Sequence, residues 1–196
     1  MDTNSWIGLA IVVGIFAAML AKLAYDAYHR VHPQKWQYCP WCRGRLKIGL
    51  IEGDEYRVCA RGCGFVHWDN PRPVCITLIP TEDGGVVLVE RSVPPKVGKI
   101  ALPGGFTKPY ESLEDCAKRE AKEETGIDVE IVRELAVLMP PGINEHLHFF
   151  LAKPTSQKPV KGSDAARAFV CPRNAIPELA FQTHTLVVQQ WLRDAA

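Results

Sequence analysis

The chain opens with a long apolar run. Residues 6–21 carry no charged side chain, and Lys22 is followed by the segment LAY. About 20 residues are needed to cross a bilayer core, so residues 6–25 predict a transmembrane helix in which Lys22 reaches the headgroups. Trp6 and Tyr25 would lie at the two interfaces. A cleaved signal peptide and a buried soluble helix are the alternatives, and the first is disfavoured because the leading MDTNS has no basic residue.

Charges around this run predict its orientation. Only Asp2 precedes it, whereas several basic residues follow it. Cytoplasmic flanks are enriched in basic residues, so we expect a single-pass membrane protein whose remaining chain faces the cytoplasm. Small residues four apart within the run would allow a second helix to pack closely, which is compatible with a homodimer. The basic residues are Lys22, Arg30 and Lys35, and the small residues are Ala10, Gly14 and Ala18.

Strand-forming residues dominate after the segment DNPRP. VCITLIP (74–80) and GGVVLVE (84–90) are rich in β-branched residues, and the turn residues 83–85 separate them. KIALPGGF (99–106) predicts a third strand that ends at a glycine pair. A helix is expected over residues 113–125, with Ser112 as its N-cap and Gly126 just past its end.

Composition excludes some classes of function. The chain has 196 residues, with 23 basic and 22 acidic side chains and a net charge of +1. General nucleic-acid binders carry a strong basic excess, so no nucleic-acid partner is expected. Hydrophobic residues make up 47% and charged residues 23%, which is typical of globular domains.

Four of the seven cysteines form a tight cluster. Cys39 and Cys42 are separated by two residues, and Cys59 and Cys63 by three. Two such pairs can supply four thiolates to one structural Zn²⁺, and a small segment with little core needs such a metal to fold. We therefore predict a zinc ribbon over residues 36–69 and a reducing compartment. The alternatives are four unligated cysteines, or His67 in place of one thiolate.

Three glutamates lie close together on the predicted helix. Glu123 and Glu124 lie three and four residues after Glu120, so they share a helix face with it and the three charges repel one another. Oxygen ligands at this spacing suit Mg²⁺ or Mn²⁺, which also bridge to substrate phosphates. The carbonyl of Gly104 is a further candidate ligand, because the glycine pair leaves the backbone open to close approach.

The segment from Gly105 to Ile127 resembles the Nudix box, G-x5-E-x7-R-E-U-x-E-E-x-G-U. Its defined positions are Gly105, Glu111, Arg119, Glu120, Ala121, Glu123, Glu124, Gly126 and Ile127. The resemblance implies an α+β fold, the Nudix α/β/α sandwich with a mixed sheet. The expected organisation is a transmembrane helix and linker over residues 1–30, a zinc ribbon over 36–69 and a Nudix hydrolase domain over 70–196. The resemblance also implies a pyrophosphohydrolase, which cleaves a nucleoside diphosphate linked to another group.

The resemblance also implies roles for individual residues. Glu120, Glu123, Glu124 and the Gly104 carbonyl would bind the divalent metal. Glu111 would pair with Arg119 and position the ligand helix. The metals would lower the pKa of a bound water that attacks phosphorus. For the base, Glu123 is the first choice within the box and Glu145 the best candidate outside it.

The remaining sequence bears on the substrate. A four-cysteine ribbon before a Nudix domain resembles both the NADH pyrophosphatases and short proteins that cleave ADP-ribose and FAD. The marker SQPWPFPxS of the first group is absent, so we expect ADP-ribose or FAD, with NADH or an NAD cap as the alternative. A non-catalytic nucleotide sensor or adaptor at the membrane is an alternative of another class. Arg91, Phe106 and Glu145 are candidate substrate contacts, whereas His184 is expected at the surface.

Overall fold

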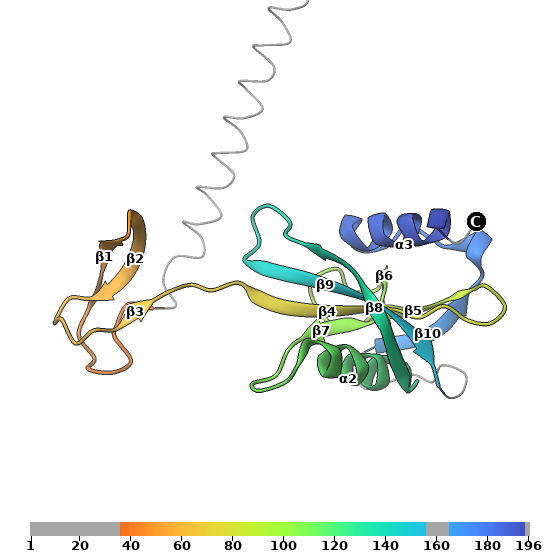
Figure 1. The fold of residues 1–196 in the computed structure, drawn as a ribbon, viewed down its shortest axis with the longest axis horizontal. Helices are drawn as coiled ribbons and strands as arrows, with labels where there is room; N and C mark the ends of the chain where they lie inside the picture. The colour runs from red at the N-terminus through yellow and green to blue at the C-terminus, as the bar shows by residue number, and fades with distance from the viewer. Residues whose placement is uncertain (1–35, 156–164, 195–196) are drawn as a thin grey trace, which may run out of the picture. The chain divides into compact units, whose positions relative to one another are not determined.

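The computed structural model describes residues 36–155 and 165–194. The chain divides into two compact units, the first ending at Asp69 and the second beginning at Asn70, and Figure 1 shows both. The predicted transmembrane helix of residues 6–25 lies outside the described residues. Among the residues that are described, no helix combines the length and the apolar character that crossing a bilayer requires.

The described part of the first unit, residues 36–69, contains a small three-stranded antiparallel sheet. It consists of β1 (Leu46–Ile51), β2 (Asp54–Cys59) and β3 (Val66–His67), in the order β1-β2-β3. A two-residue turn joins β1 to β2, with Glu52 and Gly53 both at positive φ, as the right-handed twist of a hairpin favours. Aromatic rings also contact one another in this unit, as Trp41 and Phe65 do with centroids 5.5 Å apart.

The second unit contains two sheets. The first has the order β7-β4-β9-β8 and consists of β4 (Arg72–Leu78), β7 (Gly104–Phe106), β8 (Val129–Leu138) and β9 (Glu145–Pro154). In this sheet β4 pairs with β9 in parallel and with β7 antiparallel, so the predicted mixed sheet is confirmed. The second sheet has the order β10-β5-β6, with β5 (Val86–Arg91), β6 (Ile100–Ala101) and β10 (Ala165–Cys171).

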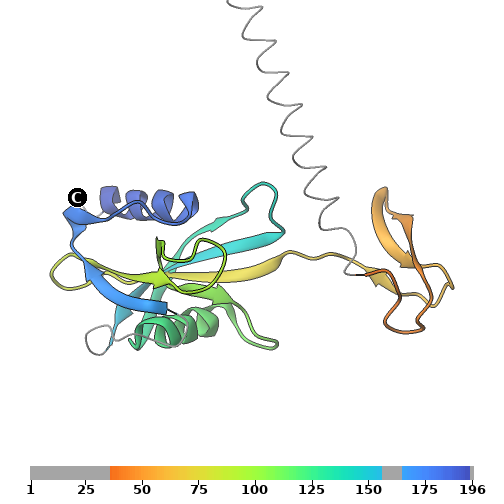
Figure 2. The ribbon, with the colours of Figure 1, turned by 180° about the vertical axis from the view of Figure 1, so that it is seen from behind.

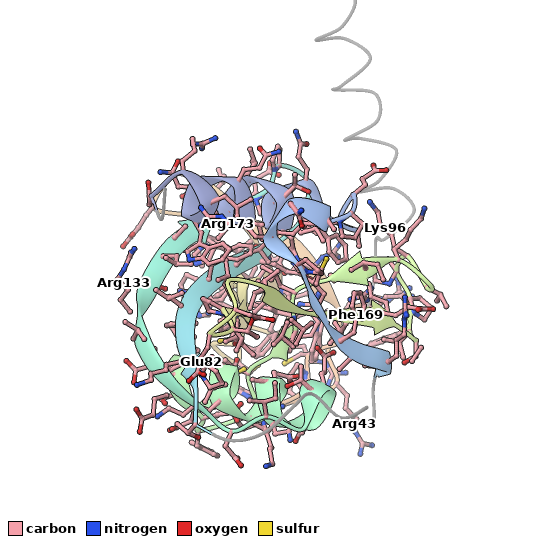
Figure 3. The ribbon with its side chains drawn as sticks, turned by 90° about the vertical axis from the view of Figure 1, so that its right-hand side faces the viewer. Arg43, Glu82, Lys96, Arg133, Phe169 and Arg173 are labelled. Carbon is pink, nitrogen blue, oxygen red and sulfur yellow. The ribbon has the colours of Figure 1, made fainter. Side chains whose placement is uncertain are left out.

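Two helices cover opposite sides of these strands. Figures 1 and 2 show α2 (Leu113–Thr125) on one side and α3 (Gln182–Asp194) on the other, with a short 3₁₀ turn (Arg173–Ala175) before α3. Successive residues of β4 point to opposite faces of the sheet and pack into two different hydrophobic cores. Ile76 lies in the core that includes Val188 of α3, and Cys75 lies in the core that includes Ala117 of α2. The end-on view in Figure 3 shows the strands between the two helices. The predicted α/β/α arrangement is therefore confirmed.

The predicted caps of α2, Ser112 at its start and Gly126 just past its end, are confirmed. The Ser112 hydroxyl accepts a hydrogen bond from the Asp115 amide at 3.1 Å. Gly126 has a φ of 72° and donates its amide to the Lys122 carbonyl. A left-handed residue after the last turn costs least when it is glycine. These caps fix which residues of α2 face the sheet.

The predicted third strand, residues 99–106, is wrong as one element. The chain forms β6 and β7, which belong to different sheets, and Leu102 and Pro103 lie between them. Pro103 has no amide hydrogen to continue a ladder. The Leu102 amide instead donates to Nδ1 of His184 at 3.2 Å. The chain therefore crosses from one sheet to the other just before the glycine pair.

His184 is buried, which corrects its expected surface position. Its side chain on α3 is 6% exposed and lies against the rings of Phe149 and Phe181, with centroids 5.5 and 5.0 Å away. Burial, together with the nearby charge of Arg91, lowers the pKa of His184 from 6.5 to about 3. The imidazole is therefore neutral in the folded protein and accepts the Leu102 hydrogen bond.

This burial predicts a pH-dependent loss of stability. Between pH 6.5 and about 3 the unfolded chain binds a proton at His184 and the folded protein does not, so stability falls as the pH falls through this window. Between pH 7 and pH 5 the loss from this group should be about 2 kcal/mol. Urea unfolding of the wild type and His184→Gln at both pH values measures it. An equal loss in both proteins would contradict the assignment.

Candidate active site

The candidate site lies where α2 meets the edge strand β7. β7 is the first strand of its sheet, so one side of its backbone has no partner among the described strands. On that side the Gly104 amide donates to Oε2 of Glu124 at 3.0 Å, and the Phe106 carbonyl accepts from Nη2 of Arg119 at 3.0 Å. In an extended residue the amide and carbonyl point in the same direction. The Gly104 carbonyl therefore also faces this edge.

Arg119 contacts three carboxylates. Its guanidinium donates to both oxygens of Glu111, at 2.6 and 2.9 Å. The remaining terminal nitrogen, Nη1, donates to Glu120 at 2.5 Å and to Glu123 at 2.9 Å. The arginine side chain is only 18% exposed, so these ion pairs are poorly screened by water. The predicted pairing of Glu111 with Arg119 is present in this geometry.

The pKa values follow from these contacts. The hydrogen bonds from Arg119 lower the pKa of Glu111 to about 2. Burial raises the pKa of Glu120, although Arg119 opposes it. For Glu123 burial also raises the pKa, but hydrogen bonds from Lys108 and Arg119 outweigh it, and the net shift is downward. Arg119 and Lys108 therefore favour the ionised forms of Glu111 and Glu123.

Negative charge exceeds positive charge at this site. Lys108 is the second cation, and its ammonium lies 3.2 Å from Glu123. The four box glutamates, Glu111, Glu120, Glu123 and Glu124, outnumber these two cations by two. Like charges held this close destabilise the fold unless a cation compensates them. A divalent cation would supply the missing charge.

The glycine pair leaves space for these acids. A Cβ atom built on Gly105 would lie 2.5 Å from a Glu120 carboxylate oxygen. One built on Gly104 would collide with the Cys75 carbonyl of the neighbouring strand. Any side chain at either position would therefore displace the strand or the glutamate, which explains why two glycines stand here.

The donors fit a hard divalent cation. Carboxylate oxygens and a backbone carbonyl are what Mg²⁺ and Mn²⁺ prefer, and Glu120, Glu123, Glu124 and Gly104 would hold the ion. In this structure Glu120 and Glu123 bind Arg119, and Glu124 binds the Gly104 amide. Among residues 36–155 and 165–194, only the cysteines at positions 39, 42, 59 and 63 bring three or more acidic, thiol or imidazole ligands within 4.8 Å of one another.

The cysteine cluster has the size of a tetrahedral metal site. The sulfurs of Cys39 and Cys63 are 3.4 Å apart, as are those of Cys42 and Cys59. A zinc ion bound by four thiolates requires sulfurs about 3.8 Å apart. His67 is not one of the gathered ligands, and its ring lies 5.4 Å from that of Trp36.

The thiols cannot all ionise together near neutral pH. Burial raises the pKa of Cys59, but the Cys63 amide and the Cys42 thiol outweigh it and lower the pKa to about 6. The Phe65 amide lowers the pKa of Cys63, but burial and the other thiols raise it to about 12. Four thiolates in this space therefore need a cation.

The three predicted substrate contacts lie in two places. Phe106 follows the glycine pair and is 46% exposed, and Glu145 begins β9 and pairs with Arg72 at 2.6 Å. Arg91 lies apart from them, because its guanidinium donates to the carbonyls of Pro95 and Val93 in the loop after β5.

No sequence pattern indicates a site role for Arg72 or Lys108. The Arg72 guanidinium lies 4.4 Å from the Phe106 ring centroid. Arg72 and Glu145 meet because β4 and β9 pair in parallel, and no short-range pattern predicts that register. Lys108 lies within the box, at one of its undefined positions.

Comparison with known families identifies the family of this domain. The model of the NUDIX domain matches residues 70–191, more than half of the chain. The protein belongs to the Nudix family. Its box residues are therefore those of a Nudix hydrolase, and the second unit is a Nudix domain.

Relatives of this Nudix protein include two kinds of enzyme. The ADP-ribose pyrophosphatase of Methanocaldococcus jannaschii is 31% identical over 124 residues, which are 61% of this chain and 73% of that protein. The NAD-capped RNA hydrolase NudC of Photobacterium profundum is 29% identical over 62% of this chain. The match spans 44% of that protein, less than half of its length.

Solved structures show the same fold. A NUDIX hydrolase from Nitrosomonas europaea superposes with a TM-score of 0.75 at 27% identity and covers 81% of this chain and 91% of its own. The NUDIX domain of Shewanella oneidensis NrtR, complexed with ADP ribose, covers 64% of this chain and 89% of its own, with a TM-score of 0.52. At 20% identity it is evidence for the fold alone.

Proposed function

We propose that this Nudix protein is a pyrophosphohydrolase, dependent on Mg²⁺ or Mn²⁺, that cleaves an ADP-linked small molecule such as ADP-ribose or FAD. The observation that carries the proposal is the excess of carboxylates around Arg119, next to the open edge of β7. A site with this charge fits a divalent cation and, through it, a pyrophosphate. The ADP-ribose pyrophosphatase of Methanocaldococcus jannaschii supports the substrate class.

The reaction is attack of water on one phosphorus of the pyrophosphate. The water oxygen forms a bond to phosphorus, the bridging P–O bond breaks, and the proton of the water passes to a carboxylate. The bound metal supplies charge neutralisation and a more acidic water. With ADP-ribose the products are AMP and ribose 5-phosphate.

The residues of the chain have separate tasks in this proposal. Glu111 holds the Arg119 guanidinium with two hydrogen bonds, and Arg119 in turn orients Glu120 and Glu123. Glu123 is 38% exposed and ionised at neutral pH, so it can reach and deprotonate a water. Glu145 is the alternative base, although its ion pair with Arg72 favours a role in binding.

Two other functions are the alternatives to this proposal. Relatives that hydrolyse NAD-capped RNA favour cleavage of NADH or of an NAD cap as the second candidate. A nucleotide sensor without turnover is the third. Purified protein with Mg²⁺ and a panel of ADP-ribose, FAD, NADH, CoA and NAD-capped RNA separates the three. Tight binding of one compound without hydrolysis of any would contradict the enzyme.

Glu124→Gln should reduce turnover at least about 100-fold. Glutamine keeps an oxygen that can accept the hydrogen bond from the Gly104 amide. The variant therefore removes the negative charge of Glu124 but not this hydrogen bond. Glu114→Gln is the matched control, because Glu114 is an exposed acid in the first turn of the same helix. Steady-state hydrolysis of the best substrate measures both. Retained activity in Glu124→Gln, or equal loss in Glu114→Gln, would refute the metal assignment.

We further propose that the first unit is a zinc ribbon. Protein purified from zinc-containing medium should carry about one zinc per chain, measured by mass spectrometry of the metal. Cys39→Ser should lose the zinc and the ordered ribbon, because a unit this small has little other stabilisation. Cys171→Ser is the control, since Cys171 lies outside the cluster. Zinc-free wild type, or full zinc in Cys39→Ser, would contradict the ribbon.

Residues 6–25 are proposed as a single-pass membrane anchor with the catalytic domain in the cytoplasm. The uncharged run and the basic residues after it support this. The full chain should remain in the membrane fraction after a high-salt wash, and a chain lacking residues 1–35 should be soluble and active. A full chain in the soluble fraction, or one cleaved after the apolar run, would disprove the anchor. Homodimerisation stays a prediction.

A further inference from the structure

A second arginine lies beside the active site. The Arg72 guanidinium donates to Oε1 of Glu145 at 2.6 Å and lies 4.4 Å from the centre of the Phe106 ring. Arg72 is 64% exposed, whereas the Glu145 side chain is only 17% exposed. The arginine therefore rests on the aromatic ring on one side and is held by a half-buried carboxylate.

The sheet register explains this arrangement. Arg72 faces Glu145 across the parallel β4–β9 pair, and Phe106 faces Val74 across β4–β7. Arg72 and Val74 are two residues apart, so their side chains lie on the same face of β4. The three side chains thus come from adjacent strands and meet on one face.

Phe106 connects this group to the catalytic residues. Its side chain supports Arg72, and its backbone carbonyl accepts a hydrogen bond from Arg119. The preceding residue, Gly105, lies against the Glu120 carboxylate. A substrate whose pyrophosphate lies at the glutamates can therefore reach this group around the edge strand.

Two groups here are available to a ligand. Within the described parts of the chain, Arg72 is the one ion-pair partner of Glu145 and bonds only its Oε1. The Arg72 guanidinium lies over the Phe106 ring in a side chain that is 64% exposed, so much of the side chain is open to a ligand. Nucleobases stack on arginine planes, and a carboxylate accepts a hydrogen bond from an exocyclic amino group.

We propose that Arg72, Phe106 and Glu145 form the base-binding subsite of this enzyme. The purine ring stacks on the Arg72 guanidinium, and Glu145 accepts a hydrogen bond from the 6-amino group. Adenine is therefore preferred over hypoxanthine, whose 6-oxo group would face a carboxylate. The inference rests on the proposed hydrolysis of an ADP-linked substrate and specifies how its adenine is recognised.

The chain provides a matched control for this subsite. Arg167 pairs with Glu90 at 2.9 Å and lies 4.5 Å from the ring centre of Phe169, so it has the same chemistry as Arg72. It belongs to β10 in the other sheet, and Figure 3 labels Phe169 on that strand. Arg167 contacts none of the box glutamates among the described residues.

The first test is steady-state hydrolysis of ADP-ribose by the wild type, Arg72→Ala, Arg72→Lys and Arg167→Ala. Loss of stacking should raise KM about 10-fold and leave kcat nearly unchanged. Lysine keeps the charge that pairs with Glu145 but not the planar face, so Arg72→Lys should also raise KM. Arg167→Ala should match the wild type. A wild-type KM in Arg72→Lys, or an equal rise in Arg167→Ala, would overturn the subsite.

The second test is the choice of base. The wild type should cleave ADP-ribose with kcat/KM at least about 10-fold above that of its hypoxanthine analogue. In Glu145→Gln this preference should largely disappear, because an amide can donate to the 6-oxo group as well as accept. An unchanged preference in Glu145→Gln would overturn the role of Glu145.

A binding measurement separates this proposal from the proposed function. AMP carries the base without a pyrophosphate, so its binding in EDTA, measured by calorimetry, requires no turnover. Weaker AMP binding by Arg72→Lys supports the subsite even where no ADP-linked compound is hydrolysed. Equal AMP binding by the wild type and both Arg72 variants overturns the subsite even where hydrolysis is intact. Thermal unfolding of each variant verifies that it is folded.

Discussion

The active site depends on one guanidinium placed among carboxylates. Arg119 binds Glu111 with two hydrogen bonds and also contacts Glu120 and Glu123. Without it, acids on adjacent turns of one helix would repel one another at close range. With it, they are held together at the edge of β7 while the cluster keeps an excess of negative charge. The same interaction thus keeps the helix stable and leaves a place for a cation.

The rest of the domain holds α2 in a fixed position beside the edge strand β7. Ser112 and Gly126 fix where α2 begins and ends, and the glycine pair lets β7 approach the glutamates without a clash. On the other side of the sheet, His184 accepts a hydrogen bond from the Leu102 amide, just before the glycine pair. Helix α3, on the opposite side of the sheet from the box glutamates, therefore also helps to position β7.

Short-range sequence patterns predict the ends of α2, the grouping of the box acids and the glycine pair. Helix caps, acids three and four residues apart and adjacent glycines all act within a few residues, so the sequence pattern predicts them directly. The division of residues 99–106 between two sheets was not predicted, because Leu102 and Pro103 are buried by contacts from distant parts of the chain. His184 was misplaced for the same reason: its burial follows from the packing of α3 on Phe149, not from its neighbours in sequence.

The group formed by Arg72, Phe106 and Glu145 is the part of the domain that local sequence patterns predict least. Arg72 and Glu145 are 73 residues apart and meet only through the parallel pairing of β4 with β9. Chemistry alone does not identify them either, because Arg167, Glu90 and Phe169 repeat the same ion pair and the same ring contact in the other sheet. What distinguishes the first group is its connection to Arg119 through the Phe106 backbone. In this domain the box acids are grouped by their spacing along the chain, whereas Arg72, Phe106 and Glu145 are brought together by which strands lie side by side.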